Sequence, residues 1–92
     1  MRPHLTTSLR VLVLSFDRIG PVGAAALAGW PALANLTELF LANNHLGADG
    51  VAAPMASPYL KQLTMLNVTA NGLSPATKRA VREHFGREVC RV

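Results

Sequence analysis

The chain has 92 residues, of which 50% are hydrophobic and 15% are charged. This composition excludes a disordered tail, and the length allows one domain. A net charge of +4 permits attraction to nucleic acid or to an anionic surface. Cys90, the single cysteine, cannot form an intrachain disulfide, which favours a reducing compartment, and we expect a cytoplasmic protein. No apolar run approaches the roughly 20 residues that a membrane span needs.

A leucine pattern recurs three times along the chain, and each copy starts 27 residues after the one before. The copies lie at residues 9–14, 36–41 and 63–68, with apolar residues at their first, fourth and sixth positions. Side chains two residues apart point to the same side of an extended segment. The pattern therefore predicts three short parallel strands, at residues 11–15, 38–42 and 65–69. Their inward leucines Leu12, Leu39 and Leu66 should stack in one buried column.

A polar residue follows each strand at a fixed offset, where the chain leaves the sheet. Asn44 and Asn71 hold this position in the second and third copies. A buried carboxamide there can both donate to and accept from backbone groups of neighbouring coils that have no sheet partner. Asp17 holds the position in the first copy and can only accept, so we expect a structural ladder with a weaker first rung.

An alanine-rich stretch follows each turn and is predicted to be helical. The stretches are residues 22–28, 49–56 and 75–85. The third has the clearest ends, because Ser74 can cap its N-terminus, Pro75 suits its first turn and Gly86 suits the position past its last turn. Pro54 removes a backbone donor within the second stretch, which we expect to be distorted or shortened.

This pattern, LxxLxLxxN followed by an alanine-rich helix, resembles the leucine-rich repeat family. The helical second half resembles the ribonuclease-inhibitor-like subclass, and the end of the chain resembles arrays found in some bacterial proteins. The resemblance implies an α/β fold, namely a right-handed solenoid of three 27-residue strand–turn–helix coils. It places the parallel strands on the concave face and the helices on the convex face. It implies a protein-binding scaffold and no enzyme, although Asp17, Val68, Pro54 and Ser74 depart from the pattern.

We expect a single leucine-rich-repeat domain over residues 1–92. The repeats are assigned to 9–35, 36–62 and 63–74, and a capping helix and tail to 75–92. Solenoids need such a polar cap to stop further stacking. Residues 1–8 are interpreted as the remnant of a preceding coil, which would make the chain a C-terminal fragment of a longer array.

The concave sheet face is the first candidate site. Its predicted outward side chains are Val11, Val13, Glu38, Phe40, Met65 and Asn67, with Ser15, Ala42 and Thr69 at the strand ends. Phe40 is the only large aromatic residue among them, and we expect Val13 and Met65 beside it with Glu38 and Asn67 at the border. Exposed apolar patches of this kind often bind proteins. Ordinary strand-filling residues remain the alternative.

A basic cluster in the cap is the second candidate site. Five of the nine Lys and Arg residues lie in the last fifteen positions, and three of these, Lys78, Arg79 and Arg82, lie along the third predicted helix. They would suit a nucleic-acid or anionic-surface binder, but without interleaved aromatic residues a solvated cap is favoured. A purely structural end-piece of a longer array is the third alternative.

The remaining candidate residues form no pattern typical of a catalytic or metal site. His4, His45 and His84 lack the close spacing of metal ligands, and no phosphate loop, carboxylate pair or nucleophile motif is present, so we expect no metal or cofactor. Trp30 is expected to pack between coils and Cys90 to be a partly buried structural thiol. The first strand offers an unpaired edge, through which the chain could self-associate.

Overall fold

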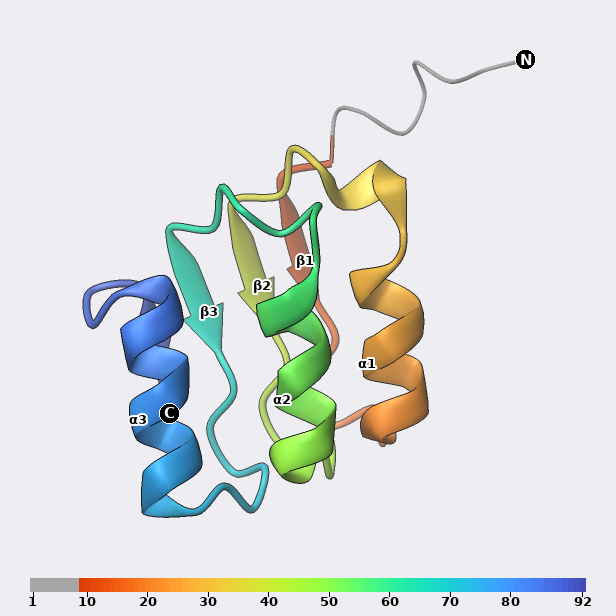
Figure 1. The fold of residues 1–92 in the computed structure, drawn as a ribbon. Coiled ribbons are helices and arrows are strands. Elements are labelled where there is room, and N and C mark those ends of the chain that lie inside the picture. The colour runs from red at the N-terminus through yellow and green to blue at the C-terminus, as the bar shows by residue number, and fades with distance from the viewer. Residues whose placement is uncertain (1–8) are drawn as a thin grey trace.

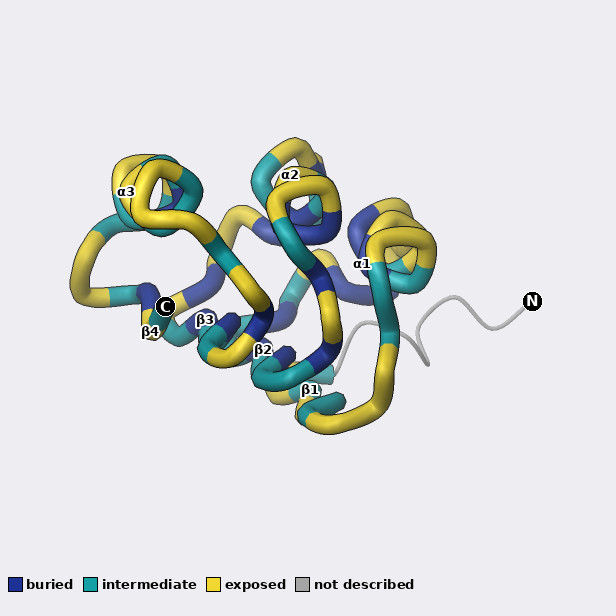
Figure 2. Tube along the Cα trace, turned by 90° about the horizontal axis from the view of Figure 1, so that it is seen from below, coloured by how far each residue is buried: buried dark blue, intermediate teal, exposed yellow. Residues whose placement is uncertain are grey.

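The computed structural model describes residues 9–92, which form two layers: a row of parallel strands and a row of helices beside it (Figures 1 and 2). In chain order the elements are β1 (Val11–Val13), α1 (Gly20–Ala28), the 3-10 helix η2 (Pro31–Leu33), β2 (Glu38–Phe40), α2 (Gly47–Ala56), β3 (Met65–Asn67), α3 (Pro75–Phe85) and β4 (Cys90–Arg91). Each helix connects two neighbouring strands by a right-handed crossover, as parallel strands require. The interpretation of 1–8 as a remnant coil lies outside the described residues.

The strands pair in the sheet order β1-β2-β3-β4, all in parallel. Leu12 lies opposite Leu39, and Leu39 lies opposite Leu66, so the predicted leucine column is confirmed. Leu39 and Leu66 are buried, whereas Leu12 in the end strand is only partly covered. The core therefore lies between the sheet and the helices, and it is most complete at the second coil.

The strands are shorter than predicted, because Ser15, Ala42 and Thr69 lie in the turns that follow them. The next residue of each turn has a left-handed backbone, with φ of 65° at Phe16, 57° at Asn43 and 57° at Ala70. A left-handed residue turns the chain away from the extended direction, which ends the strand.

The helices agree with the predicted segments at their C-terminal ends, and α1 and α2 begin two residues earlier than predicted. For α3 the predicted caps are confirmed: the Ser74 hydroxyl accepts the N–H of Thr77, and Gly86 at φ 101° follows Phe85. The expectation that Pro54 shortens the second helix was wrong, because α2 continues past this residue to Ala56. Pro54 lies in the last turn, where its missing N–H removes a single helical bond, and its ring is buried.

The fourth strand was not predicted. The tail after α3 turns back at Gly86 and joins the sheet, where the N–H of Leu66 donates to Val89 O and the N–H of Val68 donates to Arg91 O, both at 2.8 Å. Leu66 lies opposite Cys90, 24 residues further on, whereas Leu12 lies opposite Leu39 after 27 residues. The last coil is therefore shorter, and a search at the repeat period does not find its strand.

Candidate binding surface

The outward side chains of β1, β2 and β3 form a surface that we call the strand face. Its members are Val11, Val13, Glu38, Phe40, Met65 and Asn67. The register divides them into two rows across the sheet: Val11, Glu38 and Met65 in one row, and Val13, Phe40 and Asn67 in the other. The predicted set of residues is thus brought together on one side of the sheet.

The neighbours of Phe40 differ in part from the expectation. Val13 and Asn67 lie directly beside it in the same row, whereas Met65 is its diagonal neighbour on the next strand. Phe40 is half-buried, and Val13 on the end strand is 61% exposed. Phe40 and Val13 therefore present a continuous apolar strip that ends at a polar group on β3.

Asn67 supplies that polar group in a fixed orientation. Its Oδ1 accepts hydrogen bonds from the N–H of Thr69 at 3.0 Å and from the Thr69 hydroxyl at 2.8 Å. Within residues 9–92 its Nδ2 group makes no hydrogen bond, so it remains a donor that a ligand can use. The local bonds restrict the side-chain rotamer, which lowers the entropy lost on binding.

Arg91 extends the same row onto β4, opposite Asn67. Arg91 is exposed, and its guanidinium donates a hydrogen bond to the main-chain oxygen of Cys90 at 3.2 Å. The strand face thus carries an anionic Glu38 and, at its far border, a cationic Arg91. The prediction missed Arg91; the alternation of Cys90 inward, Arg91 outward and Val92 inward was the only sequence signal for it.

The predicted ladder of Asn44 and Asn71 joins the turns that follow β1, β2 and β3. Asn44 is buried; its Oδ1 accepts from the N–H of Asp17 at 2.8 Å, and its Nδ2 donates to Leu14 O at 2.7 Å. Asn71 repeats both bonds one coil later, with the N–H of Asn44 at 2.8 Å and with Leu41 O at 2.9 Å. Asp17 is exposed, and its carboxylate makes no hydrogen bond within residues 9–92. Two asparagines therefore join three turns.

The repeated strand, asparagine and helix geometry agrees with the family comparison. A sequence profile described as Leucine Rich repeat matches residues 4–28 and 32–53, just over half of the chain. The chain belongs to the leucine-rich repeat family. No curated protein and no solved structure matches it significantly. The ribonuclease-inhibitor-like subclass and a bacterial origin stay predictions.

Leucine-rich repeat domains generally mediate protein–protein interaction and are typically not enzymes. No group of His, Cys, Asp and Glu within residues 9–92 has the arrangement of a metal site. His45 is exposed in a turn with φ of 58°. None of the helices in this part of the chain is long and apolar enough to span a bilayer.

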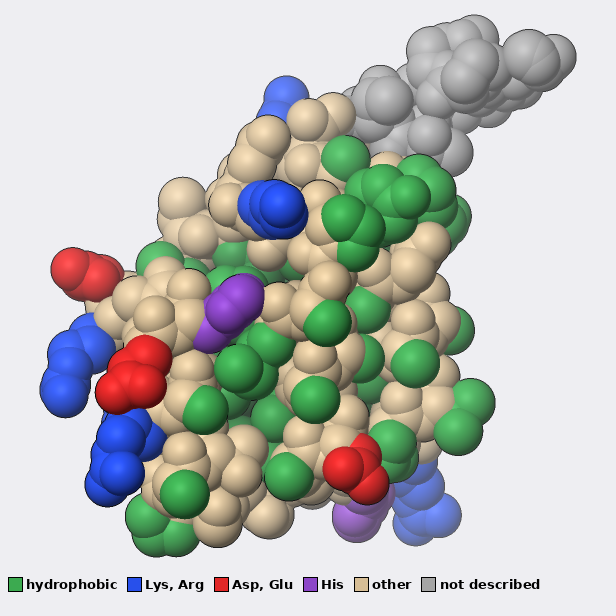
Figure 3. Space-filling model, in the orientation of Figure 1, with side chains coloured by type: hydrophobic (Ala, Val, Ile, Leu, Met, Phe, Trp, Pro, Cys, Tyr) green, Lys and Arg blue, Asp and Glu red, His purple; other side chains and the backbone are tan. Residues whose placement is uncertain are grey.

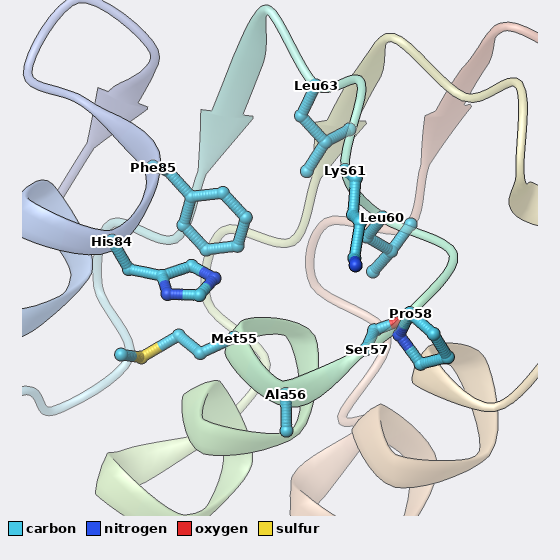
Figure 4. Close-up of a pocket in the computed structure, with 9 residues that line it drawn as sticks. All are labelled: Met55, Ala56, Ser57, Pro58, Leu60, Lys61, Leu63, His84 and Phe85. Atoms are coloured by element: carbon cyan, nitrogen blue, oxygen red, sulfur yellow. The ribbon is translucent and has the colours of Figure 1, made fainter.

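A hollow of about 500 Å³ lies between the C-terminal ends of α2 and α3 (Figure 4). The side chains of Lys61 and His84 point into it, and Met55 and Phe85 line it beside His84. The last coil is shorter than the others, so the part of the chain that the structure describes has no counterpart of residues 57–63 after α3. Ser57 at the edge of the hollow is no nucleophile, since its hydroxyl donates to Ala28 O at 2.6 Å.

The basic cluster lies on the cap. Arg79 is exposed, Lys78 and Arg82 are partly covered, and the neighbouring Glu83 is exposed as well. Figure 3 shows blue and red side chains together over α3, while hydrophobic side chains gather over α1 and α2. The mixture of signs weakens the positive potential that a phosphate backbone would need.

Cys90 and Trp30 are the two remaining residues for which a structural role was predicted. Cys90 is buried, and its thiol donates to Val81 O at 3.6 Å. Burial raises the pKa of this thiol, an effect partly opposed by Arg82 and Arg91. The expectation for Trp30 was wrong: its side chain is 48% exposed at the first coil, because no coil within residues 9–92 lies beyond α1.

Proposed function

We propose that this leucine-rich repeat chain is a scaffold that binds a partner protein through the strand face. The observation that supports it is the registered row of Val13, Phe40 and Asn67 across three strands, continued by Arg91. Aromatic residues, methionine and arginine are enriched in protein–protein interfaces, and Phe40, Met65 and Arg91 supply these types on and beside the strand face.

The chemistry of the strand face suggests the kind of protein surface it would accept. An apolar side chain of the partner would contact Phe40 and Val13, and a carbonyl or carboxylate oxygen would accept from the Asn67 Nδ2 group. Glu38 favours a basic group in the adjacent row, and Arg91 favours an acidic group at the far border. Such opposite charges raise the association rate and fix the orientation of the partner.

The experiment compares two aromatic substitutions in quantitative pull-downs followed by mass spectrometry. Phe40→Ala removes the anchor, whereas Phe16→Ala removes an aromatic side chain that is more exposed and lies in a turn outside the strand face. We expect Phe40→Ala to weaken capture of a specific protein at least about tenfold, and Phe16→Ala to leave it unchanged. Circular dichroism checks that both variants fold.

The dependence of binding on salt concentration distinguishes this proposal from binding through the basic cap. Contact with phosphates weakens by about one power of salt concentration for each phosphate neutralised, whereas an apolar contact responds little. Retention on DNA that is lost in the double variant Arg79→Ala, Arg82→Ala, together with unchanged protein capture by Phe40→Ala, would contradict the proposal. If neither substitution changes any binding, the structural end-piece is preferred.

A further inference from the structure

Asn71 and Gly72 form the only Asn-Gly pair in the sequence. The other four asparagines, each followed by a residue that has a side chain, are Asn35, Asn43, Asn44 and Asn67. The backbone nitrogen after an asparagine can attack the side-chain carbon Cγ, and glycine hinders this attack least because it has no Cβ and adopts most backbone angles. The sequence therefore marks Asn71 as the asparagine most prone to spontaneous deamidation.

The fold holds both polar groups of the Asn71 side chain, which is 4% exposed. Its Oδ1 accepts two backbone N–H groups of the preceding coil, at 2.8 and 3.3 Å. Its Nδ2 donates to the carbonyl oxygens of Leu41 at 2.9 Å, Val68 at 2.9 Å and Thr69 at 3.2 Å. All of these partners precede Asn71 in the chain, whereas deamidation requires its side chain to turn toward the nitrogen of Gly72, which follows it. These hydrogen bonds must therefore break before the reaction begins.

The carboxylate that deamidation of Asn71 forms does not fit the place of the carboxamide in the ladder. Deamidation replaces Nδ2 by an oxygen, and a carboxylate accepts hydrogen bonds but donates none. The new oxygen would face the carbonyl oxygens to which Nδ2 donates, so like partial charges would meet in a buried site. A molecule that has reacted at Asn71 therefore cannot restore the contact between its last turn and the coil before it.

The third coil has the contacts of a segment that opens before the core does. A hollow of about 500 Å³ lies between the C-terminal ends of α2 and α3, and β4 pairs with β3 through two residues. Segments with little buried contact unfold locally at a lower free energy than the whole domain. Such an opening frees the side chain of Asn71 while the first two coils stay folded.

We propose that Asn71 is a deamidation site that the folded ladder keeps closed and that local unfolding of the third coil opens. In the opened segment the nitrogen of Gly72 attacks Cγ of Asn71, and a C–N bond forms. The Cγ–Nδ2 bond then breaks, and ammonia leaves with the proton of the Gly72 nitrogen, which gives a cyclic succinimide. Water opens this ring to aspartate or isoaspartate, so the net change is water taken up and ammonia released. The reacted chain has an added negative charge and a loosened last coil.

The experiment follows deamidation of the full chain by peptide mass spectrometry, with folded protein and protein unfolded in guanidinium chloride incubated side by side in mildly alkaline buffer. Asn44 is the internal control, because it is buried in the same ladder position one coil earlier but precedes His45. In the unfolded chain we expect Asn71 to react at least about tenfold faster than Asn44, because glycine hinders the attack least. In the folded protein we expect Asn71 to react at least about 100-fold more slowly than in the unfolded chain, because the reaction waits for the opening.

Low concentrations of guanidinium chloride test whether the folded protein reacts through an opened segment. The rate at Asn71 should rise with denaturant even below the unfolding midpoint, since denaturant favours states that expose more surface. Gly72→Ala tests the role of the attacking residue. It is measured in the unfolded chain, where the strain of a side chain at φ of 70° plays no part, and should reduce the rate at Asn71 to about that of Asn44.

Asn71→Asp copies the product, and Asn67→Asp is its matched control. The Nδ2 group of Asn67 makes no hydrogen bond within residues 9–92, so the control makes the same chemical change without removing a bound donor, and its Oδ1 keeps the two bonds that it accepts. We expect Asn71→Asp to lower the unfolding midpoint and to speed hydrogen exchange in α3 and β4 more than in α2. Asn67→Asp should change neither.

Three outcomes would overturn the inference. They are similar reaction rates at Asn71 in folded and unfolded protein, similar rates at Asn71 and Asn44 in the unfolded chain, and equal losses of stability in Asn71→Asp and Asn67→Asp. The rate comparisons use the wild-type chain, so they decide the matter even if Asn71→Asp does not fold. None of these measurements involves a binding partner, so they are independent of the strand-face proposal.

Discussion

The carboxamide of Asn71 accepts the backbone N–H of Asn44 at 2.8 Å, and the two side chains, each at most 4% exposed, form successive rungs of one ladder. Each carboxamide uses both of its functions. Its oxygen accepts from the coil before it, and its nitrogen donates back to carbonyl groups of that coil and of its own turn. The turns are thereby joined where the sheet hydrogen bonds have ended.

Replacing Asn44 by Ala should lower the free energy of unfolding by about 1–3 kcal/mol, because the N–H of Asp17 and Leu14 O lose their partner. Asn71→Ala should have the larger effect, since the groups that it pairs are more deeply buried. Urea denaturation measures both. Asp17→Ala is the control and should change little; an unchanged midpoint for Asn44→Ala would contradict a structural role of the ladder.

Leu39→Ala should reduce the free energy of unfolding by about 2–5 kcal/mol, since Leu39 is fully buried at the centre of the leucine column. That is a large part of the about 5–15 kcal/mol available to a small domain, so thermal unfolding should begin near room temperature. Leu12→Ala, at the partly covered end of the same column, should have a clearly smaller effect. Equal losses would show that the first coil is as well packed as the second.

Ala70 has an exposed side chain and a left-handed backbone with φ of 57°. This conformation is unfavourable for an L-residue by roughly 1–2 kcal/mol and costs glycine little. Ala70→Gly should therefore raise the melting temperature by a few degrees, and Ala70→Asn, which copies the equivalent Asn43, should act in the same direction. Ala52→Gly, in the exposed middle of α2, is the control and should lower the melting temperature.

Cys90 should react slowly with a thiol reagent in the native protein, because it is buried against Val81 O. Its pKa is raised in the folded state, so the folded protein keeps the thiol proton where the unfolded chain loses it. The stability linked to this group is complete below the unfolded pKa and declines as the pH rises above it. Unfolding in alkaline buffers should be less pH-dependent for Cys90→Ala than for wild type; identical slopes would contradict the raised pKa.

Much of the fold follows from residues whose effect is local and repeated. Leu12, Leu39 and Leu66 recur at a constant period, which fixes which side of each strand is buried and hence the register of the sheet. Ser74, Pro75 and Gly86 each satisfy or terminate a helix end through their own backbone and side-chain chemistry, so their roles in α3 did not depend on distant parts of the chain. The outward set around Phe40 follows from the same alternation.

The burial of a side chain and the position of the last strand depend instead on contacts between neighbouring coils. Trp30 and Ser57 hold equivalent positions, yet Ser57 is buried because the first coil lies beside it, and Trp30 is half-exposed because no described coil lies beside α1. Arg91 joins the strand face only because Gly86 turns the shortened last coil back onto β3 three residues ahead of the repeat period. The sequence by itself determined the period, the inward leucines and the helix ends, because these depend on spacing within one coil. Tertiary structure decided which ends are covered, since burial depends on contacts between coils.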